Sequence, residues 1–369
     1  MARPLGHKGR RPLSVALFLG AGASAPFGYP LMAGLYNAFL KQVEEHEHYL
    51  LRALQGYQED NVETLLQSID LVTEIAESPA ASILEDARFT IRRKRTMRFH
   101  SLVTCCRSLR DKIEETIFEL YRFRPACKSS FPLYSKLFSF IREFSAASQF
   151  DIYTTNYDRI MEEFLMQAGE YRLIDGFEVD PRTKRMSWSP ESLSWPTLKV
   201  LTEPAFPVYL FKLHGSLNWM ATERGIEQMT KEIPLTKRGS ARRRNLLIYP
   251  GKKQPPEEEP FKTLYDHFET AMKTRYLCLV IGYSFRDPYL NRIFRNYLRS
   301  PPEDRTLVVM SPDCTRTTVT NLFGLGDIHD IPSYAKENLV LIPRRFGEGD
   351  WFETLQSWWT EGRLPSTST

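Results

Sequence analysis

The fold is decided by one glycine-rich stretch, Leu19-Gly20-Ala21-Gly22-Ala23-Ser24-Ala25-Pro26-Phe27-Gly28-Tyr29-Pro30. An apolar run at 13–19 precedes it and is typical of a buried strand, whereas the run at 31–40 that follows is typical of a helix. A strand that turns through glycine into a helix brings bare backbone N–H groups and a helix N-terminus together, an arrangement that attracts anions such as a pyrophosphate. An ordinary tight strand–helix turn stays open as the alternative, because position 25 is Ala and the spacing departs from the usual Gly-x-Gly-x-x-Gly fingerprint.

Further apolar runs alternate with helical patterns along the chain. Strands are expected at 150–155, 208–213, 246–249, 277–281, 306–310 and 339–342, with helices between several of them, for example at 261–274 and 289–299. This alternation predicts an α/β fold with a doubly wound, mostly parallel, Rossmann-like sheet. Two breaks, at 172–205 and 221–260, are interpreted as excursions from the sheet that form a small second lobe or lid.

The other segments define the domain organisation. Residues 1–12 are interpreted as a frayed basic tail, with a nucleic-acid or partner-binding arm as the alternative. Residues 13–345 are expected to form one domain with a helical insertion at about 40–148, where apolar residues recur at helical spacing. Residues 346–369 are expected to form a C-terminal helix and tail.

The insertion carries a basic run, whose members are Arg88, Arg92, Arg93, Lys94, Arg95, Arg98, Arg107, Arg110 and Lys112. Such a run usually marks a solvated helix face. An acidic partner surface or a nucleic-acid contact is the alternative. No aromatic stacking pattern accompanies the charges, so we expect no nucleic-acid contact by this chain alone.

Composition bounds the class of protein. The chain has 369 residues, of which 42% are apolar, and this is enough for a packed core in one large domain or two small ones. A net charge of +4 gives no overall signature of polyanion binding. The five cysteines form no Cys-x-x-Cys pair, which argues against a disulfide framework and a four-cysteine zinc module. Without a membrane-length apolar stretch or a signal-peptide core before Leu13, a reducing cytoplasm is the expected setting.

Polar residues follow several of the expected strands at the point where each strand ends. They are Thr154, Thr155, Asn156, Tyr157 and Asp158; then His214, Gly215 and Ser216; then Gly282, Tyr283 and Ser284, with Asp287 close behind. In a doubly wound sheet, ligands bind beyond the carboxyl ends of the strands. We therefore expect four strand ends, including the opening turn, to converge on one cleft.

Each of these residues also has a structural interpretation. Asn156 and Asp158 are suited to cap the helix that begins near Tyr157, and Asp287 before Pro288 is suited to cap another. Capping and ligand contact are compatible. His214 is favoured for chemistry by its place at a strand end, whereas no other histidine has a comparable setting or metal-ligand spacing. We predict no metal site.

These segments together resemble the sirtuins. Gly20-Ala21-Gly22-Ala23-Ser24 with Gly28-Tyr29-Pro30 resembles their NAD loop, Thr154 to Asp158 their Asn-x-Asp segment, and Leu213-His214-Gly215-Ser216 their His-Gly segment. Leu217-Asn218-Trp219 and Ile281 to Pro288 are more particular, and are similar to the sirtuin-like NAD hydrolases of bacterial antiphage defence systems. Protein-deacetylating sirtuins carry a four-cysteine zinc module where residues 216–275 of this chain hold no cysteine, and Asp-Phe-Arg where it has Leu31-Met32-Ala33.

The resemblance implies hydrolysis of NAD+ to nicotinamide and ADP-ribose rather than lysine deacetylation, and no zinc. It assigns Asn156 and His214 as catalytic, because an amide holds a ribose hydroxyl and a water together and an imidazole accepts a proton near neutral pH. Residues expected to bind NAD are Gly20, Ala21, Gly22, Ala23, Ser24, Pro30, Thr155, Asp158, Gly282, Ser284 and Asp287. Backbone N–H groups of residues 21–24 are expected to hold the pyrophosphate.

The resemblance also implies a biological setting, which is depletion of NAD in abortive infection. Control by homo-oligomerisation or by a partner encoded nearby, such as an ATPase, a nuclease or an Argonaute-like protein, is expected, with the helical insertion as the docking surface. The alternatives are a non-catalytic NAD or ADP-ribose sensor, a protein deacylase and a nucleic-acid-binding module that uses the basic run.

Overall fold

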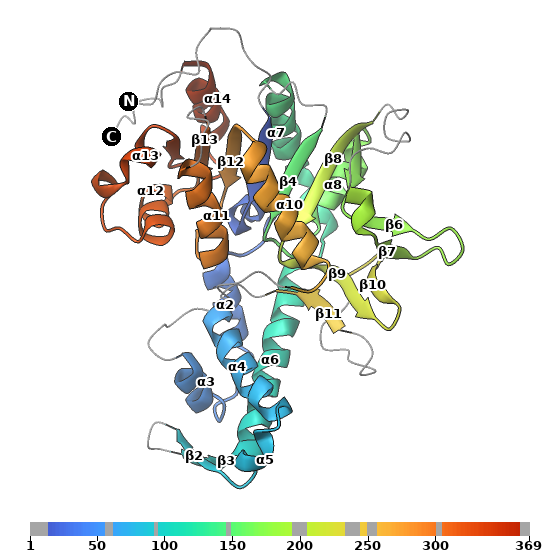
Figure 1. Cartoon of the computed structure of the whole chain (residues 1–369), viewed down its shortest axis with the longest axis vertical. Helices are drawn as coiled ribbons and strands as arrows, with labels where there is room; N and C mark the ends of the chain where they lie inside the picture. The colour runs from blue at the N-terminus through green and yellow to red at the C-terminus, as the bar shows by residue number, and fades with distance from the viewer. Residues whose placement is uncertain are drawn as a thin grey trace.

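The computed structural model describes residues 14–55, 62–91, 95–144, 149–193, 205–232, 244–248, 257–299 and 305–361. Its centre is a seven-stranded sheet in the order β14-β13-β12-β1-β4-β8-β5, in which every pair of neighbours is parallel (Figure 1). The strands are β1 Val15–Leu19, β4 Phe150–Thr154, β5 Tyr171–Ile174, β8 Phe206–Lys212, β12 Leu277–Ile281, β13 Thr306–Met310 and β14 Leu339–Ile342. The prediction of a doubly wound parallel sheet is confirmed.

The strand order has its turning point at β1. The chain adds β4, β5 and β8 on one side of β1 and then β12, β13 and β14 on the other. Every residue of β1 and β12 is buried, as expected for parallel strands covered on both faces. The carboxyl ends of β1 and β12 therefore form a topological switch point, where doubly wound sheets bind their ligands.

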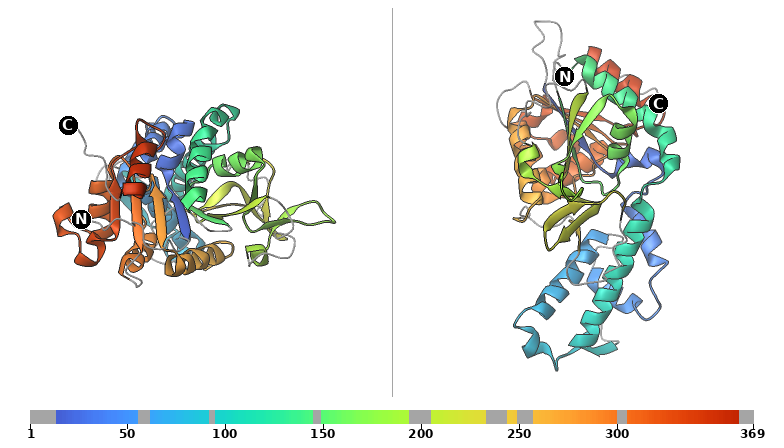
Figure 2. Two further views of the ribbon diagram at one scale, coloured as in Figure 1. Left: turned by 90° about the horizontal axis from the view of Figure 1, so that it is seen from above. Right: turned by 90° about the vertical axis from the view of Figure 1, so that its right-hand side faces the viewer.

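Helices cover both faces of this sheet (Figure 2). Val15, Leu17 and Leu19 of β1 face one apolar core with α7 Phe131–Phe144, α8 Ile160–Ala168 and α14 Trp351–Glu361. Ala16 and Phe18 face a second core with α10 Phe261–Thr274 and α11 Pro288–Arg299. Shorter helical elements complete this part: α12 Cys314–Thr317, the π-helical η4 Thr318–Leu322, η5 Ile328–Asp330 and α13 Ser333–Lys336.

A second sheet lies beside the first. It has five antiparallel strands in the order β11-β9-β10-β7-β6, with bounds β6 Phe177–Val179, β7 Met186–Trp188, β9 Gly215–Thr222, β10 Gly225–Gln228 and β11 Arg244–Leu247, and η3 Pro190–Leu193 follows β7. Parts of both expected excursions thus combine in one sheet, while residues 194–204, 233–243 and 249–256 lie outside the described residues.

One strand prediction and one excursion boundary in this region are wrong. The run at 246–249 was expected in the main sheet, but β11 pairs with β9 because the chain turns sharply after β8 and β9 starts at once. Gly215 makes that turn possible, since its φ is +84° and a Cβ there would collide with the carbonyl of Leu246. The predicted excursion at 172–205 starts too early, because Tyr171–Ile174 form the edge strand β5 beside β8.

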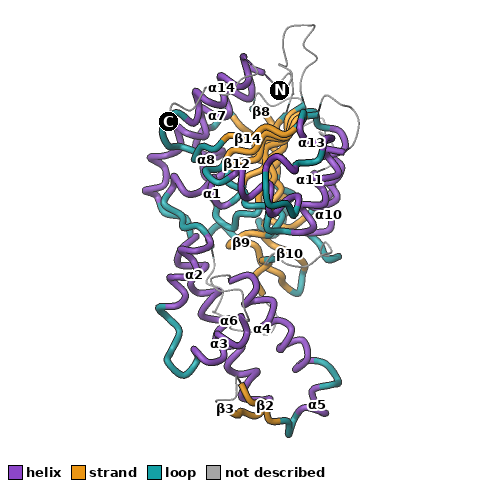
Figure 3. Tube along the Cα trace, turned by 90° about the vertical axis from the view of Figure 1, so that its left-hand side faces the viewer, coloured by secondary structure: helices purple, strands orange, loops and turns teal. Residues whose placement is uncertain are grey.

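The stretch between β1 and β4 is mostly helical. After α1 Ala21–Ser24 and η1 Ala25–Phe27 come α2 Met32–Leu40, α3 His48–Gln55, α4 Val62–Glu77, α5 Ala81–Leu84, α6 Phe99–Tyr121, η2 Pro125–Ser130 and α7. We call α3 to α6 the arm, because these elements extend away from the body of the molecule (Figures 1 and 3). The structure differs from the sequence prediction by a two-stranded antiparallel ribbon at the tip, β2 Arg88–Ile91 with β3 Arg95–Arg98, and by α7, which packs on the main sheet.

Much of the basic run is used inside the arm. On α6, Arg110 pairs with Asp70 of α4, and Arg107 Nη2 lies 3.5 Å from Glu77 Oε1. Lys112 pairs with the buried Glu47 ahead of α3. Arg88 and Arg98 face each other across the ribbon and are exposed. Arg92, Arg93 and Lys94 lie outside the described residues.

Among the described helices, none is long and apolar enough to cross a membrane.

Candidate active site

A cavity of about 350 Å³ opens at the carboxyl ends of β1, β4, β12 and β13. Most of the residues predicted from the sequence line it, namely Ala21, Gly22, Ser24, Thr155, Asn156, Asp158, His214, Gly282, Ser284 and Asp287. Gly20, Ala23 and Pro30 do not line it. Two of them bond to residues that do line it: the Gly20 carbonyl accepts from Asn156, and the Pro30 carbonyl accepts from the Tyr121 hydroxyl.

The floor of the cavity is a contact between two backbones. Gly282 has a φ of +65°, and a Cβ on Gly22 would lie 2.6 Å from its Cα atom. The Gly22 N–H donates to the Gly282 carbonyl, and the Ala23 N–H donates to the Gly20 carbonyl, both at 2.9 Å. Two of the four N–H groups expected to hold a pyrophosphate are thus already hydrogen-bonded within the protein. The expected loop is also shorter than predicted, because α1 begins directly after Gly20.

Asn156 is held in place by the end of β1. Its side-chain nitrogen donates to the Gly20 carbonyl and to Ser24 Oγ, each at 2.9 Å. Its backbone N–H donates to Thr154 Oγ1 at 3.0 Å, and that hydroxyl donates in turn to the Leu19 carbonyl. Both amide hydrogens are used in this way, so the side-chain oxygen is the group that Asn156 offers to a ligand.

Asp158 braces the same corner. Ser24 Oγ donates to its Oδ2 at 2.8 Å, and the Ile160 N–H at the start of α8 donates to its Oδ1 at 3.1 Å. Burial raises the pKa of this carboxyl, although the charge of Lys212 works against the rise. Capping is therefore one role of Asp158, as the sequence allowed.

A buried ion pair beneath this corner was missed by sequence reasoning. The Lys212 side chain is 1% exposed, and its Nζ donates to Glu162 Oε1 and Ser216 Oγ, each at 2.9 Å, and to the Asp158 carbonyl. These bonds tie the Asn-x-Asp segment to the His-Gly segment. A lysine inside the apolar run of β8 was the signal that could have revealed the pair, because lysine is seldom buried without a partner.

His214 and Asp287 approach each other across the cavity. His214 Nε2 lies 3.5 Å from Asp287 Oδ2, and the two side chains are only 3% and 7% exposed. Asp287 Oδ1 accepts from the Tyr289 and Leu290 N–H groups, so this residue also caps α11. Among the described residues, His214 Nε2 is buried with no hydrogen-bond partner. A buried polar atom without a partner calls for an explanation, and for an atom of a residue that lines a cavity a bound water or ligand provides one.

Other lining residues come from segments that no motif marked. Glu63 is on α4, Tyr121 is at the end of α6, and Arg345 and Phe346 follow β14. They reach the cavity only through the tertiary fold, and in the sequence they look like any residues of amphipathic helices or loops. The described residues contain no group of three or more His, Cys, Asp or Glu placed to hold a metal ion.

The fold and the cavity define a class of protein, the Rossmann-like proteins that bind a ligand at the switch point of a doubly wound sheet. Residues 151–321 match the family model of the SIR2-like domain. This match supports a sirtuin-like domain over these residues and bears out the resemblance to sirtuins. The matched region includes Asn156, Asp158, His214, Gly282 and Asp287.

Solved structures of Sir2 homologues cover most of the chain at low similarity. A mutant Sir2 homologue in complex with ADP-ribose has a TM-score of 0.41 at 13% identity and covers 93% of this chain and 92% of its own. A complex of a Sir2 homologue with NAD has a TM-score of 0.40 at 12% identity, covering 94% of this chain and 91% of its own. No curated protein matches the chain. The strand order of the seven-stranded sheet defines the fold.

Proposed function

We propose that this protein is an NAD+ glycohydrolase that cleaves NAD+ to nicotinamide and ADP-ribose. The observation that carries the proposal is the buried His214 Nε2, which has no hydrogen-bond partner among the described residues and lines the same cavity as Asn156. The SIR2-like domain supports an NAD-related activity. Hydrolysis is favoured over deacylation because residues 216–275 hold no cysteine for the zinc module of the deacetylases.

The chemistry needs few groups. The bond between nicotinamide and ribose breaks with its electron pair on the nicotinamide nitrogen, so the leaving group departs neutral and needs no acid. The ribose passes through an oxocarbenium-like state, as in other glycosidic cleavage. A water oxygen then forms a bond to the anomeric carbon, and its proton passes to His214 Nε2. The Asn156 side-chain oxygen accepts a hydrogen bond from that water or from a ribose hydroxyl.

The remaining residues position the dinucleotide. The close backbone contact of Gly22 with Gly282 keeps side chains out of the place where the pyrophosphate approaches. Ser284 and Thr155 offer hydroxyls at the rim, and Asp158 fixes Ser24 and through it Asn156. In the setting that the resemblance implies, the activity depletes NAD during phage infection under the control of a partner protein or of oligomerisation.

The test is nicotinamide release from NAD+ by the purified protein. We expect turnover by the wild type and its loss, by at least about a hundredfold, in Asn156→Ala and His214→Ala, since one positioned acid or base typically contributes that much. His100→Ala is the matched control, because His100 is exposed on the arm. Turnover that survives both site substitutions contradicts the assignment.

If the wild type releases no nicotinamide, two further measurements distinguish a hydrolase that needs its partner from a non-catalytic sensor. Calorimetry then measures whether NAD+ binds. The nicotinamide assay, repeated after addition of the protein encoded nearby, measures whether turnover begins. Binding without turnover under both conditions supports the sensor alternative and overturns the hydrolase.

A further inference from the structure

One carboxylate of the cavity comes from the arm rather than from the Rossmann-like body. Glu63 is in the first turn of α4 and lines the same cavity as Asn156, His214 and Asp287. The helix places it there firmly, because its neighbours Val62, Leu65 and Leu66 are buried in the core that α4 shares with the body. This residue has no part in the mechanism described above.

The surroundings of Glu63 hold charges of both signs. The charged groups that act on it include Arg286 and Asp287, in the turn between β12 and α11, and its own charge acts on Tyr121 of α6 and on Tyr283. Burial raises the pKa of its carboxyl to about 7, with Arg286 opposing the rise and Asp287 adding to it. At a pH above the ordinary pKa of a carboxyl group, such a buried carboxylate destabilises the folded state. Groups with strongly shifted pKa values are frequent at functional sites.

Three other carboxylates line the cavity, namely Asp158, Asp287 and Asp313, and the first two also stabilise the fold around it. Asp158 accepts from Ser24 and from the start of α8, and Asp287 caps α11 and faces His214. In the proposed function the pyrophosphate lies at the backbone contact of Gly22 with Gly282, whereas Glu63 interacts with Asp287, which faces His214. Of the two ends of NAD+, only the nicotinamide ring is cationic, and a carboxylate attracts it by simple Coulomb forces.

We propose that Glu63 is a recognition residue for the cationic nicotinamide ring of NAD+, supplied by the arm to the cavity of the body. The proposal rests on the proposed function for its ligand. It goes further in assigning the discrimination between oxidised and reduced dinucleotide to one side chain. It also makes the arm part of the binding site, so a partner that moves α4 would change affinity for NAD+.

The test is a set of binding constants measured by calorimetry at pH 8. The first ligand is an NAD+ analogue with a non-hydrolysable carbocyclic ribose, which keeps the cationic nicotinamide ring. The second is NADH, whose nicotinamide ring is neutral, and the third is ADP-ribose, which lacks the nicotinamide ring. We expect the wild type to bind the cationic analogue about tenfold more tightly than NADH. Glu63→Gln should lose this preference and keep its affinity for ADP-ribose. Glu74→Gln is the control, since Glu74 is exposed on the same helix.

A stability measurement accompanies the binding series. Because the folded pKa of about 7 lies above the ordinary value of 4.5, the cost of Glu63 to the fold grows as pH rises from 4.5 to 7. Glu63→Gln should therefore unfold at a higher temperature than the wild type at pH 8 and at the same temperature at pH 4. A preference for the cationic analogue that persists in Glu63→Gln, or an equal loss of ADP-ribose binding, overturns the proposal. Both readouts are independent of turnover, so absence of nicotinamide release would count only against the hydrolase.

Discussion

At the scale of single residues, the site depends on a charge that is not in its cavity. Lys212 holds the Asp158 carbonyl, Ser216 Oγ and Glu162 together from below. The pair is almost fully buried, at 1% exposure for Lys212 and 5% for Glu162. Removing one partner of a buried pair leaves the other charge without compensation, which costs far more than removing both.

We predict that Lys212→Met lowers the free energy of unfolding by about 3–5 kcal/mol, because it leaves Glu162 buried and unpaired. The double variant Lys212→Met with Glu162→Met should recover part of this loss, although the Asp158 carbonyl still lacks its donor. Urea denaturation of the three proteins measures both effects. A single variant as stable as the wild type would show that water already screens the pair.

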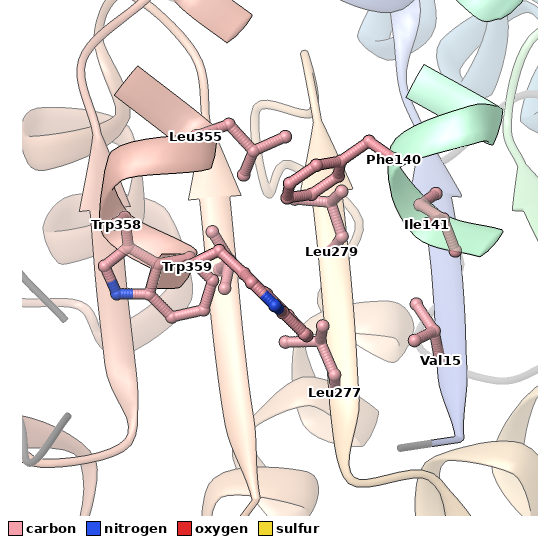
Figure 4. Close-up of a pocket in the computed structure, with 9 residues that line it drawn as sticks. Val15, Phe140, Ile141, Leu277, Leu279, Leu355, Trp358 and Trp359 are labelled. Carbon is pink, nitrogen blue, oxygen red and sulfur yellow. The ribbon is translucent and has the colours of Figure 1, made fainter. Parts of the chain in front are cut away.

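At the scale of elements, the C-terminal helix α14 completes the core of the body. Figure 4 shows Leu355, Trp358 and Trp359 of α14 beside Leu277 and Leu279 of β12, with Phe140 of α7 close to Leu279 and Ile141 of α7 next to Val15 of β1. Each of these segments is apolar in the sequence, but a gap of more than 200 residues separates α7 from α14. The helix anchors the chain close to the cavity, because Phe346, which lines it, lies 4.7 Å from Trp351 between ring centroids.

Trp358→Ala should destabilise the protein by about 3–5 kcal/mol, because it empties a buried site under the sheet. Trp358 is 6% exposed. Gln356→Ala, on the exposed side of the same helix, is the control and should change stability by no more than about 0.5 kcal/mol. Thermal or urea unfolding compares them. Equal effects of the two changes would mean that α14 is not part of the cooperative core.

At the scale of the whole molecule, the base and the tip of the arm differ in what they contribute to the cavity of the body. The base of the arm contributes Glu63 and Tyr121 to the cavity. The tip of the arm consists of α5 and the ribbon β2–β3 (Figure 1), and none of its described residues lines the cavity. The exposed Arg88 and Arg98 are at this tip. Ligand binding should therefore be separable from any role of the tip.

We predict that the tip can be removed without loss of ligand binding. A variant in which a Gly/Ser loop of about eight residues replaces residues 79–98 and rejoins α4 to α6 should bind ADP-ribose with an affinity within about twofold of the wild type. Calorimetry measures the affinity, and circular dichroism checks that the helices remain. Loss of binding in a folded variant would show that the tip shapes the cavity. Loss only of a partner's binding would assign the docking surface to the tip.

The sequence alone was sufficient to predict six of the seven strands of the main sheet and most of its ligand-binding edge. Buried parallel strands are continuous apolar runs, so β1, β4, β8, β12, β13 and β14 could be predicted without knowledge of their neighbours. The rule that such strands end at a common edge then brought Asn156, His214 and Asp287 together. That inference needed only the order of strands and polar residues along the chain.

Features that depend on a partner distant in the chain could be recognised only in the tertiary structure. The short strands β6, β7 and β10 and the ribbon β2–β3 owe their pairing to neighbours rather than to a strong local pattern, and β11 left the main sheet for β9 for the same reason. Lys212 with Glu162, and Glu63 in the cavity, became visible only when separate segments met. The physical reason is that burial and charge pairing are properties of the space around a side chain, whereas a sequence pattern records only its neighbours along the chain.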